Sequence, residues 1–145
     1  MTPEAALASI GDAHRDLADR VSPSLLEDLW YGASVAALVA ANALFGDTAL
    51  LFGLVLLGSI LSLGLFVRRF RARTGVWVSG ARRGKTRPLM VAFGLFLAAA
   101  AVAGWFIGGD GHTSLALALV VVAGVVSAAA NHAWMVIYQR ELRAS

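Results

Sequence analysis

Four long apolar segments, none containing Asp, Glu, Lys or Arg, constrain the fold of this chain more than any other feature. They cover roughly residues 29–45, 49–67, 89–107 and 114–138 of 145. Each is close to the ~20 residues that a helix needs to cross a bilayer. Only 14% of the chain is charged and 59% is hydrophobic, whereas soluble domains have about 25% and 45–50%. The sequence therefore predicts an all-α integral membrane protein with four transmembrane helices in a bundle, in a domain covering residues 25–138.

The distribution of basic residues predicts how these segments are oriented. Eight of the twelve Lys and Arg residues fall between Arg68 and Arg87, and the two short turns at 46–48 and 108–113 have none. Basic loops stay in the cytoplasm in multi-pass proteins. We therefore expect a cell inner (plasma) membrane protein whose loop 68–87, tail 139–145 and N-terminus are all cytoplasmic. The first 24 residues lack a basic region followed by an apolar one, so no cleavable signal peptide is expected.

Residues 1–24 are expected to form a cytoplasmic amphipathic helix over about 3–21. Thr2 can cap it, and Pro3 suits its first turn. One face carries apolar residues and a histidine at helical spacing, namely Leu7, Ile10, His14, Leu17 and Val21. Ser24 and Glu27 resemble a capping box for the next helix. This helix could cover the ends of the spans, or dock on the basic loop, on a second copy or on another subunit.

The basic loop contains a near match to a phosphate-binding loop, in which Ser79 is followed after four residues by Gly84-Lys85-Thr86. Such a loop needs a preceding strand and an acidic residue for magnesium. Here a membrane span follows, and no acid occurs between Thr48 and Gly109. We therefore expect no nucleotide, and we attribute the basic charge to membrane topology and not to nucleic acid.

The same charges could also contact membrane lipids or a partner, because clusters of four to eight Lys or Arg beside a span attract anionic lipid. Alternatively, they only set the topology. The candidate contact residues are Arg68, Arg69, Arg71, Arg73, Trp77, Arg82, Arg83, Lys85 and Arg87.

A candidate polar site lies inside the fourth segment, at Asn131 and His132 with Ser127 nearby. Gly124, Ala128 and His132 share one helix face, and small residues mark places where membrane helices approach closely. The histidine could form a structural hydrogen bond between helices or serve a function, as intramembrane ionisable residues often do. Nothing in the sequence indicates a cofactor or metal, and there is no cysteine.

Pairs of small residues four positions apart recur in the spans and predict close packing within the bundle or between copies. They are Gly32/Ala36, Gly58/Ser62, Gly94/Ala98 and Gly104/Gly108.

The stretch RARTGVWVSGARRGKTR at 71–87, together with RELR at 140–143, resembles a group of small four-span membrane proteins of actinobacterial type. The resemblance implies the four-span layout with a short charged N-terminal helix, and it implies no activity. Small multidrug-resistance transporters are also four-span and dimeric, and depend on a carboxylate buried in the first span. Here the nearest acids, Glu27 and Asp28, are expected at the cytoplasmic end.

These observations predict a non-enzymatic protein, because no paired carboxylates, metal cluster or nucleophile–base pair is evident. The first hypothesis is a self-associating or accessory subunit of a membrane complex, which makes it a homo-oligomer or the partner of another membrane subunit. The alternative is a small dimeric four-span transporter that uses its small-residue faces and His132.

Overall fold

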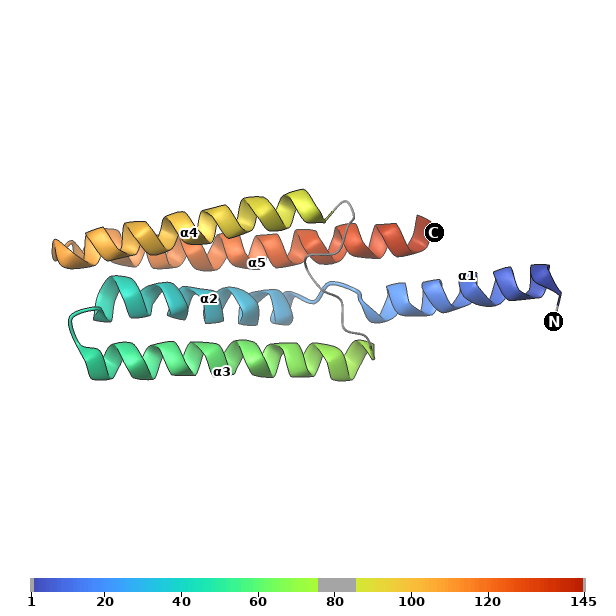
Figure 1. Ribbon diagram of the computed structural model, residues 1–145, viewed down its shortest axis with the longest axis horizontal. Coiled ribbons are helices and arrows are strands. Elements are labelled where there is room, and N and C mark those ends of the chain that lie inside the picture. The colour runs from blue at the N-terminus through green and yellow to red at the C-terminus, as the bar shows by residue number, and fades with distance from the viewer. Residues whose placement is uncertain (1, 76–85, 145) are drawn as a thin grey trace.

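The structure, a computed structural model, describes residues 2–75 and 86–144, which form five α-helices and no strand (Figure 1). The helices are α1 (Pro3–Arg20), α2 (Leu25–Phe45), α3 (Ala49–Thr74), α4 (Arg87–Gly109) and α5 (Thr113–Ala144). The predicted all-α fold is confirmed.

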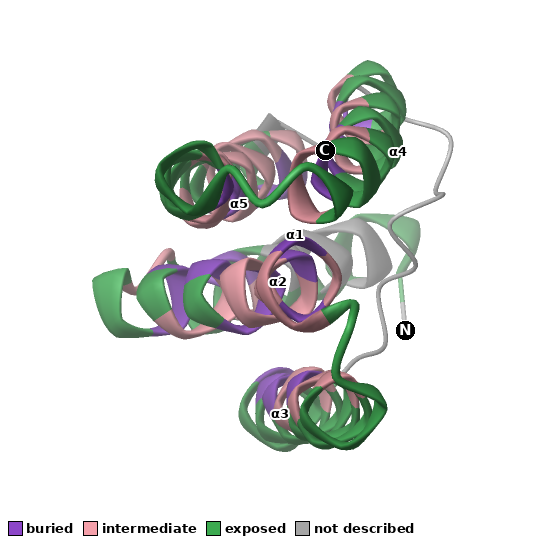
Figure 2. Cartoon of the chain, turned by 90° about the vertical axis from the view of Figure 1, so that its left-hand side faces the viewer, coloured by how far each residue is buried: buried purple, intermediate pink, exposed green. Residues whose placement is uncertain are grey.

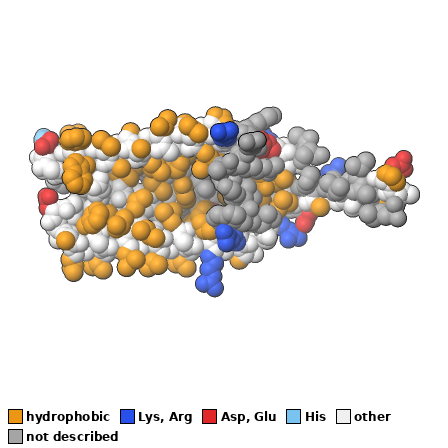
Figure 3. Space-filling view, in the orientation of Figure 1, with side chains coloured by type: hydrophobic (Ala, Val, Ile, Leu, Met, Phe, Trp, Pro, Cys, Tyr) orange, Lys and Arg blue, Asp and Glu red, His pale blue; other side chains and the backbone are white. Residues whose placement is uncertain are grey.

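Helices α2 to α5 are long and apolar enough to cross a membrane. Much of their outer surface is apolar (Figure 3), and Leu50 on α3 and Trp105 on α4 are 72% and 73% exposed. Soluble monomers rarely expose apolar surface of this extent, whereas a bilayer accommodates it. The four helices therefore fit a small integral membrane protein.

The third helix continues beyond the predicted span. α3 ends at Thr74, so its last turns contain residues that were expected in a loop, namely Arg68, Arg69, Arg71 and Arg73. Arginine is a good helix former and is favourable at the negative end of a helix dipole. The helix stops at Gly75, which has a left-handed φ of 69° and donates its N–H to the carbonyl of Arg71.

The ends of the other helices also differ from expectation. α5 continues through most of the predicted tail to Ala144, since no Gly or Pro follows Gly124. α2 begins at Leu25, with Ser24 as its N-cap residue, but the Ser24 side chain makes no capping hydrogen bond. Glu27 lies instead against Arg73 of α3, with 2.8 Å between Oε2 and Nη2. The predicted capping box is wrong, because the carboxylate has a charged partner on another helix.

The central helix of the bundle is α2. Viewed along the helices, it lies between α3 on one side and α4 with α5 on the other (Figure 2). Within residues 2–75 and 86–144, the backbone of α3 runs close to α2 and to the end of α1 but not to α4 or α5, and Phe70 of α3 reaches the buried cluster that α1 and α5 form. The position of α3 therefore depends almost entirely on α2.

Small residues let α2 approach its neighbours closely. A Cβ atom added at Gly32 would lie 2.5 Å from the carbonyl oxygen of Gly124 on α5, and one at Gly108 would lie 2.9 Å from the carbonyl oxygen of Ala43 on α2. By contrast, Gly58 and Gly94 have nothing within 4 Å of such an atom. The close packing predicted from small residues thus holds at Gly32 and Gly108, whereas Gly94 has open space around it and Gly58 lines a shallow groove between α3 and α2.

One end of α1 is attached to the bundle. Ala18 and Val21 pack in a buried cluster with residues of α3 and α5, namely Phe70, Met135, Tyr138 and Leu142. Gln139 donates a 3.1 Å hydrogen bond to the carbonyl of Ala18. The rest of α1 extends past the end of the bundle (Figure 1). The predicted Thr2 cap is confirmed by its 3.3 Å bond from the Ala5 amide.

The structure describes the side chains of only part of the apolar stripe predicted for α1. Leu17 packs against the same buried cluster as Val21. The side chains of Leu7, Ile10 and His14 lie outside the described part of the structure, so the amphipathic character of the helix stays a prediction.

Substitution of Gly32 with alanine should destabilise the bundle by about 1–3 kcal/mol, because the added methyl group overpacks the crossing of α2 and α5. Thermal unfolding of the purified protein in detergent measures this effect. The matched control is Gly94→Ala, which has open space around it and should be neutral or slightly stabilising. Equal stability of the two variants would contradict the close contact.

Candidate intramembrane polar site

A polar cluster connects the first turn of α2 with α5. Asp28 has a buried side chain, only 4% exposed, and its Oδ2 lies 2.7 Å from Nδ1 of His132. Its other carboxylate oxygen accepts a 2.7 Å hydrogen bond from Nδ2 of Asn131. A buried carboxylate is costly unless hydrogen bonds satisfy it, and these two α5 residues provide a donor to each oxygen.

The cluster is the last step of a regular antiparallel pairing between the two helices. At Gly124, an added Cβ would lie 3.1 Å from the Ala36 methyl group, and at Gly32 it would lie 2.9 Å from the Ala128 methyl group. Four residues before Gly32 on α2 and four residues after Ala128 on α5, Asp28 contacts His132. Residues four apart occupy the same face of a helix, so the small residues bring the helix axes close and the polar side chains meet at the end of that contact.

The side chains of His132 and Asp28 differ in how far they are exposed at the surface of the protein. The His132 side chain is 54% exposed, while its partner Asp28 is almost fully buried. When Asp28 is ionised, its carboxylate only accepts hydrogen bonds, and the contact then needs the hydrogen of His132 on Nδ1. The pair can therefore keep its hydrogen bond whether the imidazole is neutral or protonated.

The third residue predicted for this site does not join the cluster. Ser127 is fully buried and donates a 2.6 Å hydrogen bond to the carbonyl of Ala123 in its own helix. Serine hydroxyls in helix interiors often bond to the carbonyl four residues earlier. The structure thus brings together Asn131 and His132 and leaves Ser127 in a local role.

Asp28 is the residue of this site that the sequence reasoning missed. The sequence placed both Asp28 and His132 near the same end of their spans, and this shared depth is the signal that could have paired them. Within the described residues, no group of three or more His, Asp or Glu side chains is placed to hold a metal ion.

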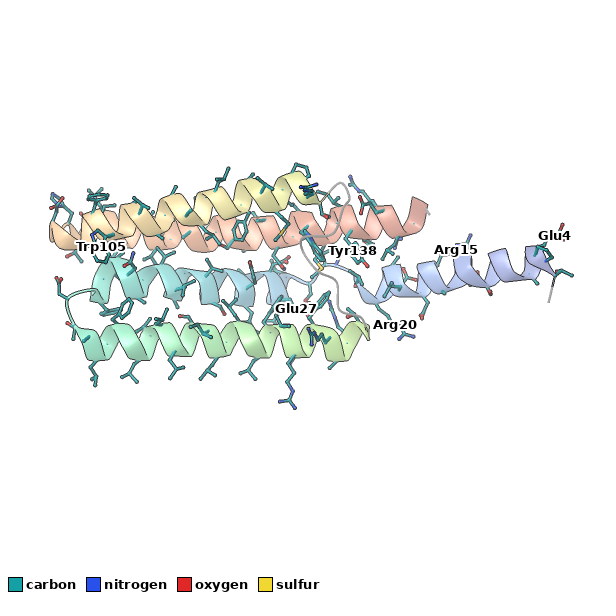
Figure 4. All side chains as sticks on the ribbon, in the orientation of Figure 1. Glu4, Arg15, Arg20, Glu27, Trp105 and Tyr138 are labelled. Carbon is teal, nitrogen blue, oxygen red and sulfur yellow. The ribbon has the colours of Figure 1, made fainter. Side chains whose placement is uncertain are left out.

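Neighbouring polar contacts connect α2 to the other two helices. Beside Asp28, Glu27 turns toward α3, where it pairs with Arg73 (Figure 4 labels Glu27). Farther along α2, the Nε1 atom of Trp30 donates a 2.9 Å hydrogen bond to Ser62 of α3, and Asn42 donates a 2.8 Å bond to the carbonyl of Ala101 on α4. These hydrogen bonds satisfy polar groups that lipid could not.

Ser34 joins Trp30 and Ser62 in a small hydrogen-bond network between α2 and α3. Its hydroxyl lies 2.7 Å from that of Ser62 and also donates to the Trp30 carbonyl at 2.9 Å. Since Ser62 accepts from Trp30, its own hydrogen is free to bond to Ser34.

The basic residues predicted as lipid or partner contacts have different surroundings. Arg73 pairs with Glu27, and the Arg69 guanidinium lies 6.0 Å from the ring centroid of Trp30, within the range of a cation–π interaction. Arg68, Arg71 and Arg87 are exposed. The remaining predicted contacts, Trp77, Arg82, Arg83 and Lys85, lie outside the described residues, as does most of the near phosphate loop.

Comparison with protein-family models, curated proteins and solved structures found no match for this chain.

A double-mutant cycle tests whether Asp28 and His132 stabilise the α2–α5 contact. Asp28→Ala should cost about 1–3 kcal/mol, because it leaves the donors of Asn131 and His132 without their acceptor. The coupling energy with His132→Ala should exceed about 0.5 kcal/mol, as for residues in direct contact. Unfolding of the wild type, the two single variants and the double variant in detergent provides the four free energies.

The control for this cycle is Asp110→Ala, which removes an exposed carboxylate at the other end of the bundle. Its effect should stay within about 0.5 kcal/mol. Strictly additive losses for Asp28→Ala and His132→Ala would show that the contact between the two side chains contributes nothing to stability.

Proposed function

We propose that the protein is a non-enzymatic membrane subunit that presents α1 as a docking helix, either to a second copy or to another subunit of a membrane complex. The observation that carries this proposal is the position of α1, which is attached at one end and extends past the bundle (Figure 1). A helix held in this way can offer a surface that the membrane does not cover.

The attachment of α1 supports a fixed direction for this helix. Its last turn packs in the cluster around Met135 and Tyr138, and Arg143 of α5 lies 3.1 Å from Asp19. An exposed ion pair adds little stability by itself, so the buried apolar cluster provides most of the attachment. A fixed helix loses less conformational entropy on binding than a disordered tail does.

The charge of α1 indicates the kind of partner. Four acids and two arginines lie between Glu4 and Val21, which makes a net charge of −2. Asp12, Arg15 and Asp16 are all exposed. Membrane-surface helices are usually rich in Lys and Arg, so α1 is better suited to a basic protein surface than to anionic lipid.

In the proposed orientation, the protein lies in the cell inner (plasma) membrane and both of its termini are in the cytoplasm. On the face shown in Figure 3, Lys and Arg side chains gather toward the α1 end of the bundle, whereas acidic side chains appear at both ends. This asymmetry, together with the positive-inside bias, supports the assignment.

Single-cysteine labelling tests the orientation, because the chain has no native cysteine. A membrane-impermeant maleimide should label Asp47→Cys in intact cells and Asp12→Cys only after the cells are permeabilised. The opposite pattern would reverse the proposed topology.

Affinity purification in mild detergent tests the docking role of α1. Asp12→Lys combined with Asp16→Lys introduces a good helix former at each of these exposed positions and reverses the charge of the helix. This variant should recover at least about tenfold less partner, or fewer additional copies, than the wild type, since like charges at an interface cost several kcal/mol.

The control removes two carboxylates at the other end of the bundle without adding Lys to the short turns, in Asp47→Asn combined with Asp110→Asn, and should behave like the wild type. Unchanged recovery with the α1 variant would refute the docking role. If the wild type recovers neither a partner nor further copies, the subunit proposal fails as a whole.

The second candidate function is a small dimeric transporter. The observation that favours it is the contact between the buried carboxylate of Asp28 and the exposed imidazole of His132, since such a pair can take up and release a proton. However, Asp28 lies in the first turn of α2, near one end of the bundle, whereas alternating access places the binding site near the middle of the membrane. The subunit proposal is therefore preferred.

A further inference from the structure

A groove lies between α3 and α4 at the end of the bundle that carries α1. Its volume is about 240 Å³, and all four spanning helices line it. It forms because the backbone of α3 runs close to α2 and not to α4 within the described residues. Apolar cavities of about 150 Å³ can bind benzene, so the groove is large enough for a substituted six-membered ring.

The walls of the groove are uncharged and rich in aromatic rings. Five of its eleven described lining residues are aromatic, and none of the eleven is Asp, Glu, Lys or Arg. The ring centroid of Tyr31 on α2 lies 5.5 Å from that of Phe66 on α3 and 6.3 Å from that of Phe93 on α4. These spacings are typical of packed aromatic pairs. An ion would find no opposite charge on these walls, whereas a flat uncharged ring can pack against them.

The lining residues also carry polar groups that no other residue uses. The Tyr31 hydroxyl forms no hydrogen bond with the described residues. The Nε1 atom of Trp134 is buried and has no partner among them. Asn131 donates from Nδ2 to Asp28, which leaves its Oδ1 atom as an acceptor. A buried donor without an acceptor is costly, so the groove suits a ligand that accepts hydrogen bonds, which a hydrocarbon chain does not.

We propose that the groove binds the ring of a lipid-soluble quinone, with its isoprenoid tail in the bilayer. A quinone ring is flat and uncharged, and its carbonyl oxygens accept hydrogen bonds of the kind that Tyr31 and Trp134 can donate. The tail can leave the groove sideways, because α3 and α4 are outer helices of the bundle (Figure 2). Such binding does not depend on the role proposed for α1.

Native mass spectrometry of the full chain in detergent compares two probes with the same tail. One is a naphthoquinone that carries a short isoprenoid chain, and the other is the isoprenoid alcohol without the ring. The wild type should bind the quinone at least about tenfold more tightly, because only the quinone has a flat ring and carbonyl acceptors. Equal binding of the two probes would assign the groove to hydrocarbon chains and overturn the proposal.

Tyr31→Phe tests the hydrogen bond without changing the walls. It keeps the ring that packs on Phe66 and Phe93 and removes a hydroxyl that no described residue uses. Quinone binding should weaken about three- to tenfold, while thermal unfolding of the ligand-free protein stays the same. Trp134→Phe should weaken binding similarly, and its matched control is Trp105→Phe at the other end of the bundle (Figure 4). Wild-type affinity in both groove variants would refute the proposed recognition.

Filling the groove tests where the ring binds. Met90→Trp places a larger side chain on the wall of the groove and should reduce quinone binding at least about tenfold. Val91→Trp is the matched control, because Val91 is 56% exposed on the same helix and does not line the groove. Val67→Trp fills the groove from the other wall, and circular dichroism checks that each variant remains helical.

Two results with these variants would overturn the assignment of the groove. If the folded groove variants bind the quinone as well as Val91→Trp does, the groove is not the site. If Met90→Trp instead loses self-association and keeps its affinity for the quinone, the occupant of the groove is a second copy of the chain.

Discussion

The close antiparallel contact between α2 and α5 is the interaction on which the rest of the structure depends. Gly32 and Gly124 remove the side chains that would keep the helices apart, and this approach brings Asp28 into contact with His132. Each polar contact described above between spanning helices has one partner on α2, toward α3, α4 or α5. In lipid there is little hydrophobic force between helices, so small residues and hydrogen bonds determine which helices associate.

Local composition was sufficient to predict the four spanning helices, because uncharged apolar runs of this length have few alternatives in a chain. The helix ends were harder to predict. The arginines from Arg68 to Arg73 were interpreted as a loop on the basis of charge, yet arginine continues a helix readily and Gly75 is the residue that ends α3. Likewise, Glu27 matched a local capping pattern, and its actual partner, Arg73, is distant in the sequence.

The candidate site was predicted only in part, for the same reason. Asn131 and His132 stand out because they are polar within an apolar span, and a single helix is enough to recognise them. Their partner Asp28 is unremarkable at the start of its helix, where acids are common. Which acid they contact depends on the register between α2 and α5, and that register follows from glycines on both helices. Small residues occur at similar spacing around Gly94, where no helix packs, so spacing alone does not predict the register.

The first-turn position of Asp28 has a consequence for the order in which the protein is assembled. Synthesis runs from the N-terminus, so α2 reaches the membrane before α5 has been made. A carboxylate in the middle of α2 would then lack its partners in hydrocarbon, whereas one in the first turn can remain hydrated at the interface. When α5 arrives, Asn131 and His132 replace that water. A helix made later in the chain, α5, therefore fixes α2 in place.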